Sequence, residues 1–218
     1  MRVIAIDGPA GAGKSTVARR VAVVTGLPFL DTGAMYRCVA LKVLRLGIDP
    51  DDAEAVAAAA RGAVISVGDG RAVLDGSDVS VDIRTPEVNR VVSRIATNSA
   101  VRTLMREAQR EWALRAGGGV VEGRDIGTVV FPDAVLKVFL TASPRVRALR
   151  RVAESGGDVD EVARSIAERD LIDSTREDSP LKPAPGAVEV DSSDDGIDDV
   201  VSAIVAHYRR ATEGAGRG

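Results

Sequence analysis

The sequence is poor in cysteine, histidine and aromatic residues. Its 218 residues include one cysteine, Cys38, and one histidine, His207, and aromatic residues make up 3% of the chain. A single cysteine excludes an internal disulfide and any cysteine-rich metal site. A single histidine excludes histidine triads and multi-histidine metal centres as the main chemistry. The core must therefore be built from Val, Ala, Leu and Ile, and we expect Cys38, which lies in a helical apolar run, to be a buried thiol.

The chain also lacks a long apolar run and a strong excess of one charge. No stretch reaches the roughly 18 apolar residues of a membrane span, and the first residues enter a strand pattern, so we expect neither a membrane partner nor a signal peptide. The 29 basic and 32 acidic residues give a formal net charge of −3, which argues against nucleic-acid binding by bulk charge. We expect a cytoplasmic monomer that acts on small molecules.

The most informative segment present is a glycine-rich loop near the N-terminus. Residues 2–7 have the pattern of a short buried strand, a helical pattern follows the loop, and the segment between them matches G-x-x-x-x-G-K-[ST]. Glycines let the backbone N–H groups curl around a polyphosphate, and the following helix adds its positive end. The flanking elements disfavour a chance turn, so we predict a nucleoside triphosphate site formed by Gly8, Pro9, Ala10, Gly11, Ala12, Gly13, Lys14, Ser15 and Thr16. Within it, Lys14 would reach the β- and γ-phosphates and the Ser15 hydroxyl would bind Mg²⁺.

Short apolar runs alternate with helical periodicity along the chain. Such alternation predicts an α/β fold with a five-stranded parallel sheet flanked by helices. The strands are expected at 2–7, 27–30, 120–121, 135–140 and 187–190, and the helices at 16–25, 32–47, 52–61, 86–96, 101–115, 143–153, 159–172 and 197–210.

The alternation is interrupted by three short β-like runs at 64–67, 72–74 and 79–81. The glycine-containing segments 68–70 and 75–76 between them are hairpin signals. We therefore predict a small three-stranded β insert at 62–83, with the core formed by 1–61 plus 84–218.

Other polar motifs follow the predicted strands, and in parallel sheets such strand ends meet in one crevice. Asp31 or Thr32 can cap the next helix, and Arg37 either clamps an anion or is a solvated helix residue. After the strand at 120–121, Arg124 could bind a phosphate and Asp125 could accept from an amine, while Glu122 could order Mg²⁺ through water. The alternative is an internal salt-bridged turn.

Arginines are concentrated in the last third of the chain, at positions 145, 147, 150, 151, 164, 169 and 176. The run is either a solvated helix face or a mobile lid, about 145–165, that brings arginines onto a transferring phosphoryl group and excludes water. Arg169 and Asp173 are four residues apart on one helix face. They form either a plain surface ion pair or a site for two vicinal sugar hydroxyls.

Five strings together resemble the bacterial cytidylate kinase family over about residues 2–210. They are Ile6-Asp-Gly-Pro-Ala-Gly-Ala-Gly-Lys-Ser-Thr16, Leu30-Asp-Thr-Gly-Ala-Met-Tyr-Arg37, Ile83-Arg-Thr-Pro-Glu-Val88, Glu122-Gly-Arg-Asp-Ile-Gly-Thr-Val-Val-Phe-Pro132, and Glu168-Arg-Asp with Asp173 and Arg176. The resemblance implies a P-loop nucleoside monophosphate kinase that phosphorylates CMP and dCMP with ATP and Mg²⁺. The insert at 62–83 matches the piece that distinguishes this family from shorter adenylate-type kinases.

The resemblance also implies roles for individual residues. Arg37 and Arg124 would hold the acceptor phosphate, with Thr32 at a position where some members carry serine, and Arg176 would complete the site. Ser93, Arg102 and Asp125 would recognise cytosine, and Arg169 and Asp173 the sugar. The residues expected to act on the transferring phosphate are Lys14, Arg124, Arg147 and Arg151.

Two rival functions remain. A uridylate/cytidylate kinase of the adenylate type would lack the insert. A nucleotide switch of the GTPase kind should carry an Asn-Lys-x-Asp guanine reader, and the sequence has none. A coupled assay of ADP release with each nucleoside monophosphate separates these possibilities.

Overall fold

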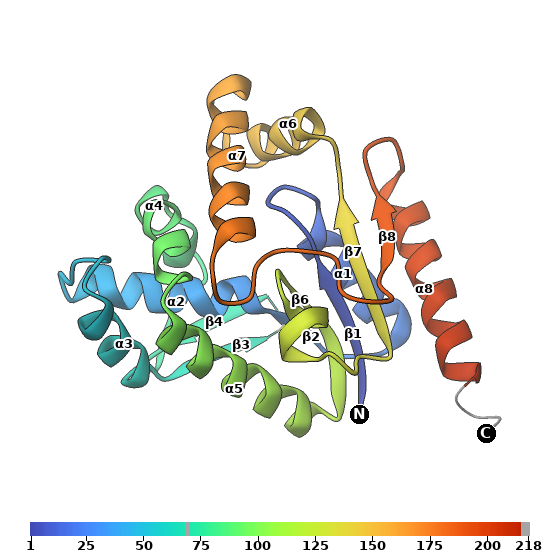
Figure 1. Cartoon of the computed structure of the whole chain (residues 1–218), viewed down its shortest axis with the longest axis horizontal. Helices are drawn as coiled ribbons and strands as arrows, with labels where there is room; N and C mark the ends of the chain where they lie inside the picture. Colours follow the sequence, from blue (N-terminus) through green and yellow to red (C-terminus); the bar gives the residue numbers. More distant parts are fainter. Residues whose placement is uncertain (69, 215–218) are drawn as a thin grey trace. The chain divides into compact units, whose positions relative to one another are not determined.

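The computed structural model describes residues 1–68 and 70–214 (Figure 1). It divides into two compact units, Met1–Phe29 with Ala113–Gly218, and Leu30–Trp112. We call them the first and second unit and describe each separately. Within the described residues, no helix is both long and apolar enough to cross a membrane.

A five-stranded sheet with the order β2-β6-β1-β7-β8 forms the framework of the first unit. The central strand β1 pairs in parallel with β6 and β7, and β7 pairs in parallel with β8. The predicted five-stranded parallel sheet flanked by helices is confirmed. The strands are β1 (Arg2–Asp7), β2 (Phe29–Asp31, which crosses the unit boundary), β6 (Gly118–Gly123), β7 (Leu136–Thr141) and β8 (Val188–Asp191).

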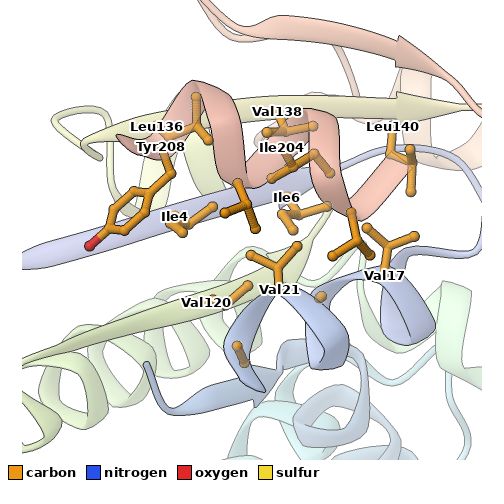
Figure 2. Close-up of a cluster of buried hydrophobic side chains, with 14 of the residues drawn as sticks. Ile4, Ile6, Val17, Val21, Val120, Leu136, Val138, Leu140, Ile204 and Tyr208 are labelled. Atoms are coloured by element: carbon orange, nitrogen blue, oxygen red, sulfur yellow. The ribbon is translucent and has the colours of Figure 1, made fainter. Parts of the chain in front are cut away.

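Two helices cover one face of this sheet, α1 (Lys14–Thr25) and α8 (Ile197–Gly214). Figure 2 shows Val17 and Val21 of α1 and Ile204 of α8 pointing at the side chains of β1 and β7. The core here is almost entirely aliphatic, as the low aromatic content predicts, although it includes Tyr208 and the partly buried Phe29 packs against it. Close packing of these branched side chains holds the N-terminal strand and α1 rigidly, and the glycine-rich loop lies between those two elements.

The remaining elements of the first unit follow β6 and β7. A wide helical turn, η2 (Ile126–Val130), comes directly after β6, and two helices, α6 (Pro144–Ser155) and α7 (Val159–Thr175), follow β7. Ser143 caps α6 through its hydroxyl, and Asp158 caps α7 through its carboxylate, which accepts from two backbone N–H groups. Gly156 and Gly157 form the predicted break between α6 and α7.

The second unit combines helices with a separate antiparallel sheet in the order β3-β4-β5. The sheet lies within 62–83, where the sequence predicts three short strands, and the turn Asp75-Gly76 joins β4 to β5. The unit contains α2 (Thr32–Arg45), α3 (Ala53–Arg61), β3 (Ile65–Gly68), β4 (Arg71–Leu74), β5 (Ser77–Asp78), the 3₁₀ turn η1 (Asp82–Arg84), α4 (Pro86–Ile95) and most of α5 (Ser99–Ala116).

The third strand of this sheet differs from its prediction at 79–81. Strand β5 covers Ser77–Asp78, and the chain then turns into η1. The two-residue turn starts the return strand immediately, so pairing runs Leu74 to Ser77 and Val73 to Asp78. The apolar pair Val79 and Val81 misled the prediction, since Val79 is buried after the strand and Val81 is exposed. The hairpin signal at 68–70 includes residue 69, which lies outside the described residues.

Candidate active site

The glycine-rich loop joins β1 to α1 as predicted. Gly13 is the N-cap of α1 and has a φ of 84°, in the left-handed region that glycine tolerates. Lys14 is 7% exposed, and its ammonium donates to the Pro9 carbonyl oxygen at 2.7 Å. Ser15 and Thr16 are exposed on the first turn of the helix. The loop therefore has the shape and the helix N-terminus that suit a polyphosphate.

Two arginines of α6 hold the outer side of this loop. Arg147 donates to the Ala10 carbonyl oxygen at 3.0 Å, and Arg150 donates to the Ala12 carbonyl oxygen at 3.4 Å. In a trans peptide the C=O of one residue and the N–H of the next point in opposite directions. Holding these two carbonyls therefore turns the following N–H groups, those of Gly11 and Gly13, to the other side of the loop.

Asp170 of α7 completes this arrangement. Its carboxylate accepts from the Ala10 N–H at 3.1 Å and forms an ion pair with Arg147. Arg147 also donates to the Ala142 carbonyl oxygen, and its side chain is buried. The other predicted lid arginine, Arg151, pairs with Glu154 on its own helix at 3.2 Å. Contact of Arg147 and Arg151 with a transferring phosphate stays a prediction.

Three predicted substrate residues meet in the first unit. Arg124 donates through Nε to Asp173 at 2.8 Å, and Arg176 donates to the other oxygen of the same carboxylate at 3.3 Å. Asp173 is buried, and the pKa of its carboxyl lies below its usual range because the charges of Arg124, Arg169 and Arg176 outweigh the effect of burial. The sequence alternative of a surface ion pair between Arg169 and Asp173 does not fit this burial.

Several of these charged groups affect the pKa of Lys14 in the loop. This pKa falls from 10.5 to about 7, chiefly because of burial and also because of the positive charges of Arg124 and Arg169, while Glu122 and Asp173 act in the opposite direction. Such effects require the charged groups to be close to one another. The residues of three separate motifs therefore share one electrostatic environment around Lys14.

Asp7, at the end of β1, forms a second buried contact near the loop. Its carboxylate accepts from the N–H groups of Ile126 at 2.8 Å and Gly127 at 2.7 Å. The pKa of Asp7 rises from 3.8 to about 6, chiefly because of burial and with a smaller contribution from Asp125, against the lowering effect of the two amides and of Lys14. These bonds tie β1 to the residues that directly follow Arg124 and Asp125, both predicted to bind substrate.

In the second unit, the predicted anion site lies at the start of α2. Of the two possible caps, Asp31 caps the helix, since its carboxylate accepts from the Ala34 N–H at 2.9 Å. Thr32 follows as the first residue of the helix and is buried. Arg37 donates to the Ile83 carbonyl oxygen at 2.9 Å, and Arg84 lies 3.6 Å from Asp31. Arg37 is thus held by η1 and is not a freely solvated arginine.

The predicted base-recognising residues of this unit lie on α4 and α5. Arg102 is 1% exposed, donates to the Ala96 carbonyl oxygen at 3.2 Å and lies 5.8 Å from the centre of the Tyr36 ring. Such a distance is typical of a cation–π contact. Ser93 is half-buried on α4, which packs against α2. Thr32, Arg37, Ser93 and Arg102 belong to the second unit, and all the other predicted site residues belong to the first.

Sequence reasoning left four of these contacts unassigned. Arg150 and Asp170 hold residues of the predicted phosphate loop, whereas Asp7 and Arg84 hold residues next to predicted substrate residues. Three of the four, all but Arg150, stand inside the motif strings. A charged residue at the end of a buried strand, as Asp7 is, was the one available signal. The partners of the others are far away in sequence, so no periodicity could reveal them.

The magnesium ion that the sequence analysis expects would be held by few protein side chains. No cluster of three or more metal-ligating side chains occurs in the described parts of the chain. Magnesium commonly keeps few protein ligands and binds through substrate phosphates. The exposed Ser15 hydroxyl at the start of α1 and the buried Glu122 carboxylate at the end of β6 are compatible with that mode.

Comparison with known proteins shows extensive sequence similarity. The family model described as cytidylate kinase matches residues 4–210. The chain is 52% identical over 202 residues to "Cytidylate kinase" of Mycolicibacterium paratuberculosis, covering 88% of each chain. It is 51% identical over 216 residues to "Cytidylate kinase" of Pelotomaculum thermopropionicum, covering 93% of this chain and 94% of that protein.

Solved structures support the fold at much lower identity. A gluconokinase from Sinorhizobium meliloti aligns with a TM-score of 0.51 and 19% identity, covering 98% of this chain and 95% of that one. An uncharacterized protein from Eubacterium ventriosum aligns with a TM-score of 0.54 and 11% identity, covering 96% and 99%. Because the family model spans nearly the whole sequence and the relatives share half of its residues, the chain belongs to the cytidylate kinase family.

Proposed function

We propose that this protein transfers the γ-phosphoryl group of ATP to CMP and dCMP, forming CDP and dCDP by direct in-line displacement. The observation that carries the proposal is the group of charges around Lys14. Arg124 comes from the motif after β6 and Arg169 from the motif on α7, and both affect the pKa of the P-loop lysine. Positive groups from three motifs around one polyphosphate loop suit a reaction that brings two anionic nucleotides together.

The chemistry needs alignment and positive charge more than a strong base. Phosphoryl transfer spreads negative charge over the equatorial oxygens of the transferring group. The loop amides and Lys14 would bind the donor phosphates, and Arg124 would bind the acceptor phosphate. A magnesium ion held by Ser15 and the nucleotide, with Glu122 acting through water, would supply further positive charge. The single histidine, on α8, is not needed for any of these tasks.

The acceptor would be held by residues of several motifs. Arg37 and Arg124 would bind its phosphate, with Thr32 and Arg176 beside them. Arg169 and Asp173 would bind the sugar hydroxyls, and the carboxylate of Asp173, already fixed by Arg124 and Arg176, would accept from them. Two of these arginines would thus orient the group that recognises the sugar.

Cytosine recognition would use Ser93, Arg102 and Asp125. An arginine can donate to the O2 and N3 acceptors of the base, and a carboxylate can accept from its exocyclic amine. Uracil presents a carbonyl at the amine position, so a carboxylate would repel it. Residues of about 145–165 would close over the donor as a lid, with Arg147 and Arg151 near the transferring phosphate.

The proposal is tested by an ADP-release assay with ATP, Mg²⁺ and each nucleoside monophosphate in turn. We expect turnover with CMP and dCMP, far slower turnover with UMP, and CDP or dCDP as products by ³¹P NMR. ATP turnover that ignores the monophosphate would exclude a kinase of this kind. In the variant Asp125→Ala the preference for CMP over UMP should narrow, and an unchanged preference would remove Asp125 from base recognition.

Two further measurements test the finer parts of the proposal. In-line displacement inverts the configuration at phosphorus, so ATP made chiral at the γ-phosphate should give an inverted product. Retention would indicate a covalent phosphoenzyme instead. Light scattering on a size-exclusion column should give the mass of one chain if the protein acts as a monomer.

A further inference from the structure

The carboxylate of Asp7 is a costly feature that the proposed reaction does not use. Asp7 is 3% exposed, and burial is the largest influence on its pKa. A buried carboxylate is expensive unless it is paired or hydrogen-bonded. Here one oxygen accepts from the Ile126 N–H and the other from the Gly127 N–H, at 2.8 and 2.7 Å. The buried carboxylate is therefore stabilised by hydrogen bonds from two consecutive amides of one turn.

Those amides are the first two N–H groups of the turn η2. The first N–H groups of a helical turn have no partner within the turn. In η2, the N–H groups of Val129 and Val130 bond back to the Asp125 carbonyl oxygen, but those of Ile126 and Gly127 bond to Asp7. Asp7 thus caps the turn from a strand more than a hundred residues away in sequence.

The anchor itself is fixed much more firmly than the turn that it holds. Asp7 lies in the central strand β1, opposite Gly123 of β6 and Phe139 of β7. The two neighbouring strands therefore hold its backbone on both sides. Loss of the carboxylate should therefore leave β1 in place and loosen η2. We call residues 123–127 the acceptor loop, since Arg124 and Asp125 lie within it.

We propose that Asp7 is a positioning residue that fixes the acceptor loop, and with it Arg124 and Asp125, for binding of the nucleoside monophosphate. The loop is also closely packed at Gly127, because a Cβ added there would lie 3.1 Å from the Lys137 side chain and 3.2 Å from Ala184. Asp7 pulls the turn toward the sheet, and the close packing at Gly127 limits its approach. The inference rests on the proposed function for the identity of the ligand, but the contact between Asp7 and the loop does not.

The protonation state of Asp7 decides whether it can hold both amides. An ionised carboxylate accepts at both oxygens, whereas a protonated one has an O–H group that donates. The charged groups that act on Asp7 are Asp125, which favours protonation, and Lys14, which favours ionisation. The acceptor loop should therefore be held above about pH 6 and loosened below it.

Steady-state kinetics of the variant Asp7→Asn test the proposal. The asparagine side chain keeps the size but places an NH₂ group opposite one of the two amides. We expect the KM for CMP to rise by roughly tenfold while the KM for ATP changes by less than about twofold, as loss of a hydrogen bond to a charged group would give. Equal changes in both constants, or no change for CMP, would overturn the proposal.

A control variant separates positioning from a general loss of stability. Ile4→Val removes one methylene from the same strand, β1, at a position in the hydrophobic core shown in Figure 2. It should lower the melting temperature and leave both KM values unchanged. If Ile4→Val raises the KM for CMP as Asp7→Asn does, the effect belongs to stability and the proposal is wrong.

A spectroscopic measurement tests the contact even if CMP proves not to be the substrate. In ¹⁵N-labelled protein without nucleotide, the amide signals of Ile126 and Gly127 should shift together with a midpoint near pH 6. In Asp7→Asn this step should disappear from both signals. A step that persists in the variant would show that another group controls the loop. If the step disappears in Asp7→Asn but the parent protein does not turn over CMP, the proposed function is wrong and the contact between Asp7 and the loop stands.

Discussion

Arg147 of α6 and Asp170 of α7 hold opposite ends of one loop residue, Ala10. The arginine binds the Ala10 carbonyl oxygen, the aspartate binds the Ala10 N–H, and the two side chains pair with each other. Both helices that follow β7 are therefore attached to the glycine-rich loop through charged side chains, the buried Arg147 and the half-buried Asp170. Because loss of one member leaves the other charge without its partner in a largely buried place, this contact should set the shape of the loop.

Loss of either partner should weaken ATP binding. We expect Arg147→Ala and Asp170→Ala each to raise the Kd for ATP by roughly tenfold, which corresponds to about 1.4 kcal/mol. The double variant should be little worse than either single one, giving a coupling of about 1 kcal/mol measured by calorimetry. The pair on α6, Arg151 and Glu154, is exposed and offers the control, since Glu154→Ala should leave ATP binding unchanged. Additive effects of the two loop variants would contradict this account.

A methyl group at Gly8 should disrupt the entry into the loop. An added Cβ would lie 1.9 Å from the Leu140 carbonyl oxygen, and Gly8 has a φ of +154°. Leu140 is in β7 and cannot retreat, so Gly8→Ala should cost about 3 kcal/mol or more in unfolding free energy. Gly47 also has a positive φ, +64°, but open space around it, so Gly47→Ala should cost only about 1 kcal/mol. Urea unfolding measures both, and equal losses would exclude the clash as the cause.

The pH dependence of stability should carry the signature of Asp7. Its pKa is about 6 in the folded protein against 3.8 as a model value, so between these values the folded state keeps a proton that the unfolded state has lost. The resulting stability is fully present below pH 3.8 and is lost as the pH rises through 6. Relative to Asp7→Asn, the parent protein should lose about 3 kcal/mol across this window. A flat difference between the two proteins in urea unfolding would refute the raised pKa.

Ionisation of Asp7 therefore has two opposite effects over the same range of pH. It favours positioning of the acceptor loop and lowers the stability of the folded protein. Its ionised form holds both amides of the acceptor loop but is the form that burial penalises. Comparison with the variant is necessary because other carboxyls act in the opposite sense. Asp78, for example, has a pKa lowered to about 2, chiefly by hydrogen bonds from Ser80, and favours folding at higher pH.

Cys38 should be chemically inert in the folded protein. It is 0% exposed, and burial, with smaller contributions from Asp31 and Asp75, raises the pKa of its thiol to about 12. The reactive species is the thiolate, so iodoacetamide at pH 8 should modify the native protein far more slowly than the protein in urea. Mass spectrometry gives both rates, and the urea sample is the control for access. Rapid modification of the native protein would show that this helix opens readily.

Local chemistry was sufficient to predict much of this molecule. The glycine pattern between an apolar strand and a helix predicted the phosphate loop, and alternating periodicities predicted the parallel sheet. These features depend on residues that are neighbours in sequence, and steric and hydrogen-bonding rules act over that range. The prediction of a strand at 79–81 was wrong, since β5 covers Ser77–Asp78. The alternation of Val79 and Val81 matches a strand pattern although both residues follow the strand.

The long-range contacts were decided by tertiary structure alone. Asp7 and Ile126 are 119 residues apart, and Ala10 and Asp170 are 160 apart. Sequence indicated which carboxylates and arginines exist, but a charged side chain can pair with many partners, and only the packing of the sheet and its helices selects one. The chemical groups of the site were therefore determined by sequence, whereas their protonation, burial and partners were set by the fold.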